Sequence, residues 1–105
     1  MRTIKVSNLK SLRSGLSVKN QFEIYESTKT TTSYTFQSYN TIIAKVIYKN
    51  GHQILILDKN ALYYSRTTSK YLYQFLDDIS QCRGMRKKEI EKAIENKEIK
   101  LKNLN

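Results

Sequence analysis

Residues 41–58 read Thr-Ile-Ile-Ala-Lys-Val-Ile-Tyr-Lys-Asn-Gly-His-Gln-Ile-Leu-Ile-Leu-Asp, and this stretch decides the fold. Two runs rich in β-branched residues flank Asn50-Gly51, a pair that tolerates the positive φ angles of a type I′ turn. A two-residue turn fixes the register of a hairpin. The expected cross-strand pairs are Val46–Leu55 and Ala44–Leu57 on a core face, and Ile47–Ile54 and Lys45–Ile56 on a second, mixed face that is partly covered.

Upstream of this hairpin, two further segments alternate apolar and polar residues. Residues 20–27 carry Phe22 and Ile24 on one side, and residues 34–39 carry Tyr34 and Phe36. This period of two predicts half-buried strands, with the polar run 27–33 as a hairpin loop between them or, because threonine suits extended backbone, as an extended edge. Residues 1–20 fit two alternatives, a short strand that begins at Ile4 or a short helix with a leucine face that ends near Gly15.

Downstream, the period changes from two to that of a helix. Ser65 or Thr67 can cap a helix that runs from about Thr67 to Cys82 and stops at Gly84. Its apolar positions follow the i, i+3, i+4, i+7 pattern, namely Leu72, Phe75, Leu76 and Ile79. A second helix is expected from the next apolar stripe, supported by Glu98 and Lys102 at i, i+4. That stripe comprises Ile90, Ala93, Ile94, Leu101 and Leu104.

The predicted fold class is therefore α+β. We expect residues 1–105 to form a single domain with a small antiparallel sheet of three to four strands, the hairpin at Asn50-Gly51, and two C-terminal helices packed on one face. A chain of 105 residues suits one hydrophobic core.

Charge is the strongest compositional signal. Nineteen Lys and Arg against nine Asp and Glu give a net charge of +10. Residues 1–75 hold eleven of the cations and three of the anions, a balance of +8, whereas residues 76–105 are nearly balanced. Such a field attracts anions such as a nucleic-acid backbone. A lysine-rich proteome is the alternative explanation.

The sequence contains few residues that could form a catalytic or metal-binding site. His52 is the only histidine and lies beside the hairpin turn, Cys82 is the only cysteine, and Asp77-Asp78 would point about 100° apart on a helix. We expect no enzyme activity, no metal and no cofactor. The first residues lack the apolar run of a signal peptide, and no run is long enough to span a bilayer, so we expect a cytoplasmic location and no membrane contact.

The candidate binding site lies in residues 63–73, where cations, hydroxyls and aromatic rings alternate at a helix start. Arg66, Lys70 and Gln74 should point outward together. A helix N-terminus with hydroxyls and an arginine suits a phosphate, and Tyr64 or Tyr71 could stack on a base. The alternative is that hydroxyls cap the helix and tyrosines flank the core. The predicted partner- or phosphate-binding residues are Tyr64, Arg66, Thr67, Lys70, Tyr71, Arg86, Lys87 and Lys88.

The last three of these residues open the second helix, where cations are unfavourable to the helix dipole, so they suggest an anionic partner. Arg83, late in the first helix, instead suits that helix's negative C-terminal end. The apolar stripe of the second helix should dock on the chain's own sheet, with a homodimer through this helix as the alternative.

Two motifs carry a family resemblance. Ser38-Tyr39-Asn40-Thr41-Ile42-Ile43-Ala44, followed by Tyr64-Ser65-Arg66-Thr67-Thr68-Ser69-Lys70-Tyr71-Leu72 and Phe75, resemble a small domain that recurs in bacteriophage proteins of uncharacterised function. The match covers roughly residues 34–76, and it departs from the family at Tyr71, where the family often has His. The resemblance implies phage origin and an accessory role, such as that of an anti-CRISPR-type protein.

Two functions follow as expectations. The first is a phage-encoded, non-enzymatic inhibitor or modulator of a host ribonucleoprotein or defence complex, in the cytoplasm of the bacterial host. The second is a basic module that binds DNA or RNA directly in the phage's own replication or transcription.

Overall fold

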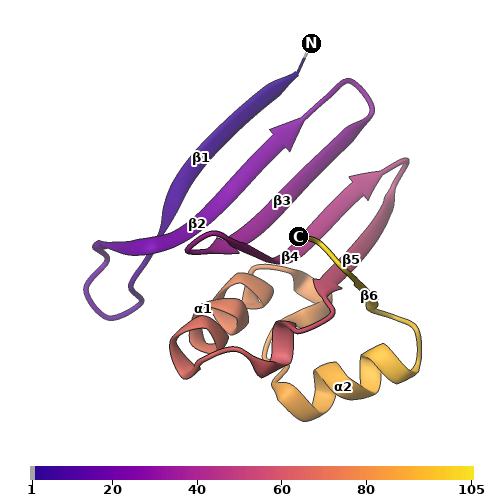
Figure 1. The fold of residues 1–105 in the computed structure, drawn as a ribbon. Coiled ribbons are helices and arrows are strands. Elements are labelled where there is room, and N and C mark those ends of the chain that lie inside the picture. Colours follow the sequence, from indigo (N-terminus) through magenta and orange to yellow (C-terminus); the bar gives the residue numbers. More distant parts are fainter. Residues whose placement is uncertain (1) are drawn as a thin grey trace.

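The computed structural model describes residues 2–105, which fold into a six-stranded mixed sheet with two short α-helices (Figure 1). The strands follow one another in sequence order across the sheet. They are β1 (Thr3–Lys10), β2 (Ser17–Ser27), β3 (Thr31–Ser38), β4 (Thr41–Lys49), β5 (His52–Asp58) and β6 (Lys100–Lys102). Between β5 and β6 lie the 3-10 turn η1 (Ala61–Tyr63), α1 (Arg66–Asp77), the 3-10 turn η2 (Ser80–Cys82) and α2 (Lys87–Glu95).

The expectation of a three- to four-stranded antiparallel sheet is therefore wrong. Strand β1 resolves the ambiguous N-terminal segment as a strand, and only Leu9 of its residues is buried. Leu12 and Leu16, which suggested a helix face, lie exposed in the turn between β1 and β2. The last strand, β6, runs parallel to β5 and makes the sheet mixed.

The hairpin of β4 and β5 is confirmed in every predicted pair. Ala44 faces Leu57, Val46 faces Leu55, and the two pairs of the other face are also as expected. Asn50 and Gly51 have φ angles of 52° and 77°, the left-handed conformation that a type I′ turn requires. The register predicted from the local turn chemistry is therefore the register of the folded hairpin.

The two helices are shorter than the sequence pattern suggested. Helix α1 begins after the cap residue Ser65, whose Oγ accepts a hydrogen bond from the Thr68 backbone N–H at 3.3 Å. It ends at Asp77 rather than at Cys82, and the chain continues into η2. Helix α2 ends at Glu95, because Lys97 turns left-handed with a φ of 62°. Residues 100–102 then extend along β5 instead of continuing a helix.

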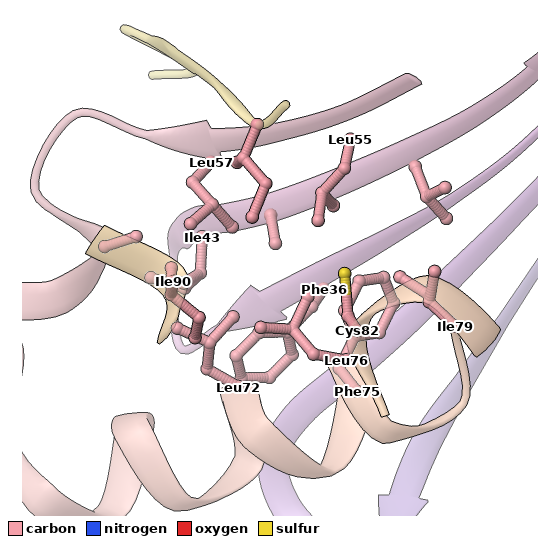
Figure 2. Packing of buried hydrophobic residues seen from close by; sticks show 14 of the residues in the cluster. Phe36, Ile43, Leu55, Leu57, Leu72, Phe75, Leu76, Ile79, Cys82 and Ile90 are labelled. Carbon is pink, nitrogen blue, oxygen red and sulfur yellow. The ribbon is translucent and has the colours of Figure 1, made fainter. Parts of the chain in front are cut away.

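Both helices cover the same face of the sheet (Figure 1). Their buried residues meet the inward side chains of β3, β4 and β5, and Figure 2 shows Leu72 and Phe75 of α1 and Ile90 of α2 converging on Phe36, Ile43 and Leu57. The rings of Phe36 and Phe75 stack with their centroids 5.9 Å apart. The expected docking of the second helix on the chain's own sheet is confirmed, since Ile90 is fully buried in this core.

The opposite face of the sheet carries no helix within residues 2–105. The pairing places Val6, Ile24, Thr35, Lys45 and Ile56 in one cross-strand row on this face. Val6 is 63% exposed on the edge strand, whereas Ile56, between β4 and β6, is buried. None of the helices described here therefore covers the mixed face of the hairpin.

A buried carboxylate fixes the end of the chain to the sheet. Asp58, which is 2% exposed at the end of β5, accepts hydrogen bonds from the backbone N–H groups of Leu104 at 3.0 Å and Asn60 at 3.2 Å. The side chains of Tyr64 and Asn105 donate two more, each at 3.2 Å. Burial alone would raise the pKa of Asp58, but these four donors outweigh it and hold the pKa below its ordinary value.

Candidate functional site

A groove of about 500 Å³ runs along the outer side of α1. Six of its lining residues lie on α1 at spacings of three and four, which places them on one helical stripe. This stripe consists of Arg66, Ser69, Lys70, Tyr73, Gln74 and Asp77. Leu12, Tyr64 and Arg86 complete the lining from the segments on either side.

Three cations come together in this groove, one from the start of α1, one from its first turns and one from the segment before α2. Arg66 and Lys70 are exposed, and among residues 2–105 neither forms an ion pair. Arg86 lies over the ring of Tyr73, with 5.2 Å between its guanidinium carbon and the ring centroid. Its Nη1 donates to the Met85 carbonyl at 2.7 Å and pairs with the Asp77 carboxylate at 3.4 Å. The groove therefore offers two cations without an ion pair among residues 2–105, Arg66 and Lys70. The third, Arg86, is held in place by its contacts with its neighbours.

A hydroxyl network holds α1 against the sheet beside this groove. The Oγ of Ser38, at the end of β3, lies 3.1 Å from the Oγ1 of Thr68 in a buried hydrogen bond. Ser65 Oγ in turn donates to the Thr68 hydroxyl at 3.3 Å. The two sequence motifs that carry the family resemblance thus meet at Ser38 and Thr68, and their exposed cations Arg66 and Lys70 remain at the surface.

We expect Thr68→Val to destabilise the protein by about 1–2 kcal/mol, because the isosteric methyl leaves the Ser38 hydroxyl buried without its partner. Thermal unfolding followed by circular dichroism measures the change. Thr67→Val, one residue earlier and exposed, is the matched control and should stay within about 0.5 kcal/mol of the parent. Equal losses in the two variants would contradict a structural role for the Ser38–Thr68 bond.

The remaining predicted site residues occupy different places. Thr67 and Lys88 are exposed but do not line the groove, and Lys87 lies over the exposed ring of Tyr63 at 5.7 Å. Tyr71 is 7% exposed and belongs to the core, so it cannot stack on a base. Of the eight residues predicted from the sequence, the groove brings together Tyr64, Arg66, Lys70 and Arg86.

Tyr64 is half-buried and has its hydroxyl committed. Its OH donates to the Asp58 carboxylate, and burial followed by the charge of Asp58 raises the pKa of Tyr64. The phenol therefore stays protonated and contributes a ring edge to the groove rather than a reactive oxygen.

Tyr73 is one of the groove residues that the sequence-based prediction missed. It lies three residues after Lys70 and seven after Arg66, so the helical period that grouped Arg66, Lys70 and Gln74 also reaches it. Leu12 could not be found in this way, because its turn reaches α1 only through the tertiary fold. The contact between this turn and α1 includes a hydrogen bond of 2.7 Å from the Gln74 side-chain amide to the Lys10 carbonyl, at the end of β1.

None of the cations on the strands is among the residues that line this groove. Arg2 pairs with Glu26 at 2.9 Å, and the register places Lys45 on the face of the sheet that the helices leave open. Arg83 behaves as expected for the end of a helix, since its Nε donates to the Asp77 carbonyl at 3.3 Å. The cations that line the groove are therefore Arg66 and Lys70 of α1 together with Arg86.

The residues that could in principle support catalysis differ in their surroundings. His52 is exposed beside its turn, Asp77 accepts a hydrogen bond from the Gly84 backbone N–H at 2.9 Å, and burial raises the pKa of the Cys82 thiol. Within residues 2–105, no three His, Cys, Asp or Glu side chains are grouped as they would be around a metal ion. None of the helices described is long and apolar enough to cross a membrane.

The fold and the groove define a small basic protein with a mixed sheet, helices on one face and a cationic, aromatic groove along α1. The chain belongs to a family of unknown function, DUF8033, whose model matches residues 5–92, from β1 into α2. This agrees with the expectation of an uncharacterised family. No curated protein and no solved structure matches the chain.

Proposed function

We propose that this chain is a non-enzymatic binding protein whose α1 groove receives the sugar-phosphate backbone of a nucleic acid. The observation that carries the proposal is the convergence of Arg66, Lys70 and Arg86 on one groove that also contains the rings of Tyr64 and Tyr73. Arginine binds phosphate oxygens through two N–H groups at once, and an exposed tyrosine ring can stack on an unpaired base.

The proposed setting is a phage-encoded protein that modulates a host nucleic-acid machine, of which a CRISPR effector is one example. Two features support it: the motifs at residues 38–44 and 64–72 resemble those of phage proteins, and the net charge of +10 suits the RNA or DNA of such a complex. The open sheet face, with Val6 and Ile24, offers apolar area for the protein part of the complex. The second candidate is a module for the phage's own replication or transcription, which the groove supports equally because it requires only naked nucleic acid.

The direct test is to measure the affinity for short single-stranded RNA, single-stranded DNA and duplex DNA by fluorescence anisotropy, at salt concentrations from about 50 to about 200 mM. We expect binding that weakens steeply with salt. The variant Arg66→Gln/Lys70→Gln/Arg86→Gln should lower the slope of log K against log salt by about 2 to 3, because each lost phosphate contact removes about 0.7 to 0.9.

The matched control removes three exposed cations that lie outside the groove, as Lys29→Gln/Lys49→Gln/Lys92→Gln. It has the same net charge as the groove variant, so it corrects for the general field of the protein. Equal losses in the two variants, or no binding by the parent to any of the three nucleic acids, would contradict the proposed groove.

A pull-down from host lysate, performed with and without nuclease, separates the two settings. Retention of a host protein complex after nuclease treatment supports the modulator. Loss of every retained protein after nuclease treatment, together with affinity for naked nucleic acid, supports the replication or transcription module.

A further inference from the structure

A second cavity, of about 560 Å³, lies on the helix-covered face of the sheet, between the central strands and the end of α1. Its lining includes the rings of Tyr34, Tyr48 and Phe75 and the carboxyl groups of Glu23 and Asp78. None of these residues lines the groove of α1. Both sites contain aromatic rings, but the charged side chains of the cavity are acidic, whereas those of the groove are mainly basic.

The tyrosines form two walls of this cavity. The ring centroids of Tyr34 and Tyr48 lie 6.3 Å apart, and the ring planes meet at 85°. Tyr25 packs on Tyr34 with 5.2 Å between centroids and holds that ring in place. The faces of aromatic rings carry negative partial charge and attract cations, most strongly where water is partly excluded.

The two carboxylates are placed where they cost stability. Asp78 is the C-cap residue of α1 and adds its charge to the negative end of the helix dipole. Glu23 is half-buried, and burial followed by the charge of Asp78 raises the pKa of Glu23. Among the side chains that the structure describes, none donates a hydrogen bond or forms an ion pair with either carboxylate, although Lys5 projects from the same face of the neighbouring strand.

A chain with nineteen Lys and Arg has many cations with which to neutralise two acidic groups, yet these two remain without one. An added cation would reduce the repulsion between the two carboxylates. It would also offset the free-energy cost of burying the charge of Glu23. A guanidinium group suits this cavity better than an ammonium group. Its flat face stacks on a tyrosine ring, while its five N–H donors, arranged in a fork, reach carboxylates at its edge.

We propose that the cavity between Tyr34, Tyr48, Glu23 and Asp78 is a binding site for a guanidinium group. Free guanidine compounds and the arginine side chain of a partner protein share this chemistry. The site is independent of the nucleic-acid groove, so each can be tested without the other.

The test uses NMR titration of the full chain with ethylguanidinium, with ethylammonium, and with the peptide acetyl-Gly-Arg-Gly-amide. We expect saturable shifts of the Tyr34 and Tyr48 ring protons and of the Glu23 amide, with ethylguanidinium bound more tightly than ethylammonium. Tighter binding of the peptide than of ethylguanidinium would identify a partner's arginine as the natural source. Tighter binding of ethylguanidinium would identify a free guanidine.

The variant Glu23→Gln/Asp78→Asn keeps the shape of the cavity and removes both charges. It should lose at least about tenfold in affinity, because charge-assisted hydrogen bonds contribute most of the binding. Glu95→Gln, an exposed change on α2, is the matched control and should bind as the parent does. The same Glu23→Gln/Asp78→Asn variant should keep or raise the melting temperature, because it removes two unfavourable charges, so weaker binding cannot result from unfolding.

Three results would overturn the proposal. They are the absence of saturable shifts with every guanidinium probe, unchanged affinity in the Glu23→Gln/Asp78→Asn variant, and equal affinity for ethylammonium and ethylguanidinium.

Discussion

Replacing Asp58 with alanine is expected to destabilise the protein by about 3 kcal/mol, because hydrogen bonds to a buried charged group each contribute about 1.5–3 kcal/mol and the variant leaves their donors unsatisfied. The groups affected are the backbone N–H groups of Leu104 and Asn60, the hydroxyl of Tyr64 and the side-chain amide of Asn105. Domains of this kind are stable by only about 5–15 kcal/mol, so the loss is large. Urea denaturation followed by circular dichroism measures it. Asp78→Ala, which removes an exposed carboxylate without hydrogen-bond donors among the described side chains, is the control and should not destabilise the protein.

The same carboxylate makes stability depend on pH in a defined direction. The pKa of Asp58 is lower in the folded protein than in the unfolded chain, so the unfolded state binds the proton more tightly. Its contribution to stability is complete above the unfolded pKa of about 3.9 and is lost as the pH falls through the lower folded pKa. Asp58→Asn should flatten the acid side of the stability curve. A variant that loses stability in acid as steeply as the parent would exclude Asp58 as the responsible group.

Phe36→Ala is expected to cost about 3–5 kcal/mol, the range for truncating a fully buried phenylalanine. Phe36 on β3 is completely buried and stacks on Phe75, so its removal opens a cavity between the sheet and α1. Phe22→Ala is a matched control because Phe22 lies on the adjacent strand, is half-buried and points to the open face. It should cost less than half as much in urea denaturation. Equal costs would contradict a sheet that is covered on one face only.

The parts of the fold that the sequence predicted correctly are those determined by residues close together in the chain. Asn50-Gly51 sets the register of β4 and β5 through the conformation of two residues, and the apolar stripe that contains Leu72 and Phe75 sets the buried side of α1. The prediction that one helix includes all apolar residues from Ile90 to Leu104 was wrong. The helical period continues by chance beyond the end of α2 into a segment that forms β6. There Lys97 is left-handed, and the pairing of Leu101 with Leu57 depends on a strand more than forty residues earlier.

The candidate groove was partly predictable for the same reason. Arg66 and Lys70 share a helical stripe and a short segment of sequence, so their common orientation follows from the helical period. The predicted role of Tyr71 in stacking on a base required its ring to lie on the exposed side of α1. The ring of Tyr71 lies instead on the side of α1 that faces the sheet, where it is buried. The acidic cavity had no sequence signature, because Glu23 and Asp78 are about half the chain apart and come together only in the tertiary fold.

The order of the strands has a consequence for how the chain folds. Each strand from β1 to β5 pairs with its neighbour in sequence, so these pairings close short loops and form quickly. The pairing of β5 with β6 closes a loop that contains both helices, and its loop-closure entropy is correspondingly larger. We therefore expect the hydrogen bonds that Leu104 and Asn105 donate to Asp58 to form late in folding, after the pairings of neighbouring strands.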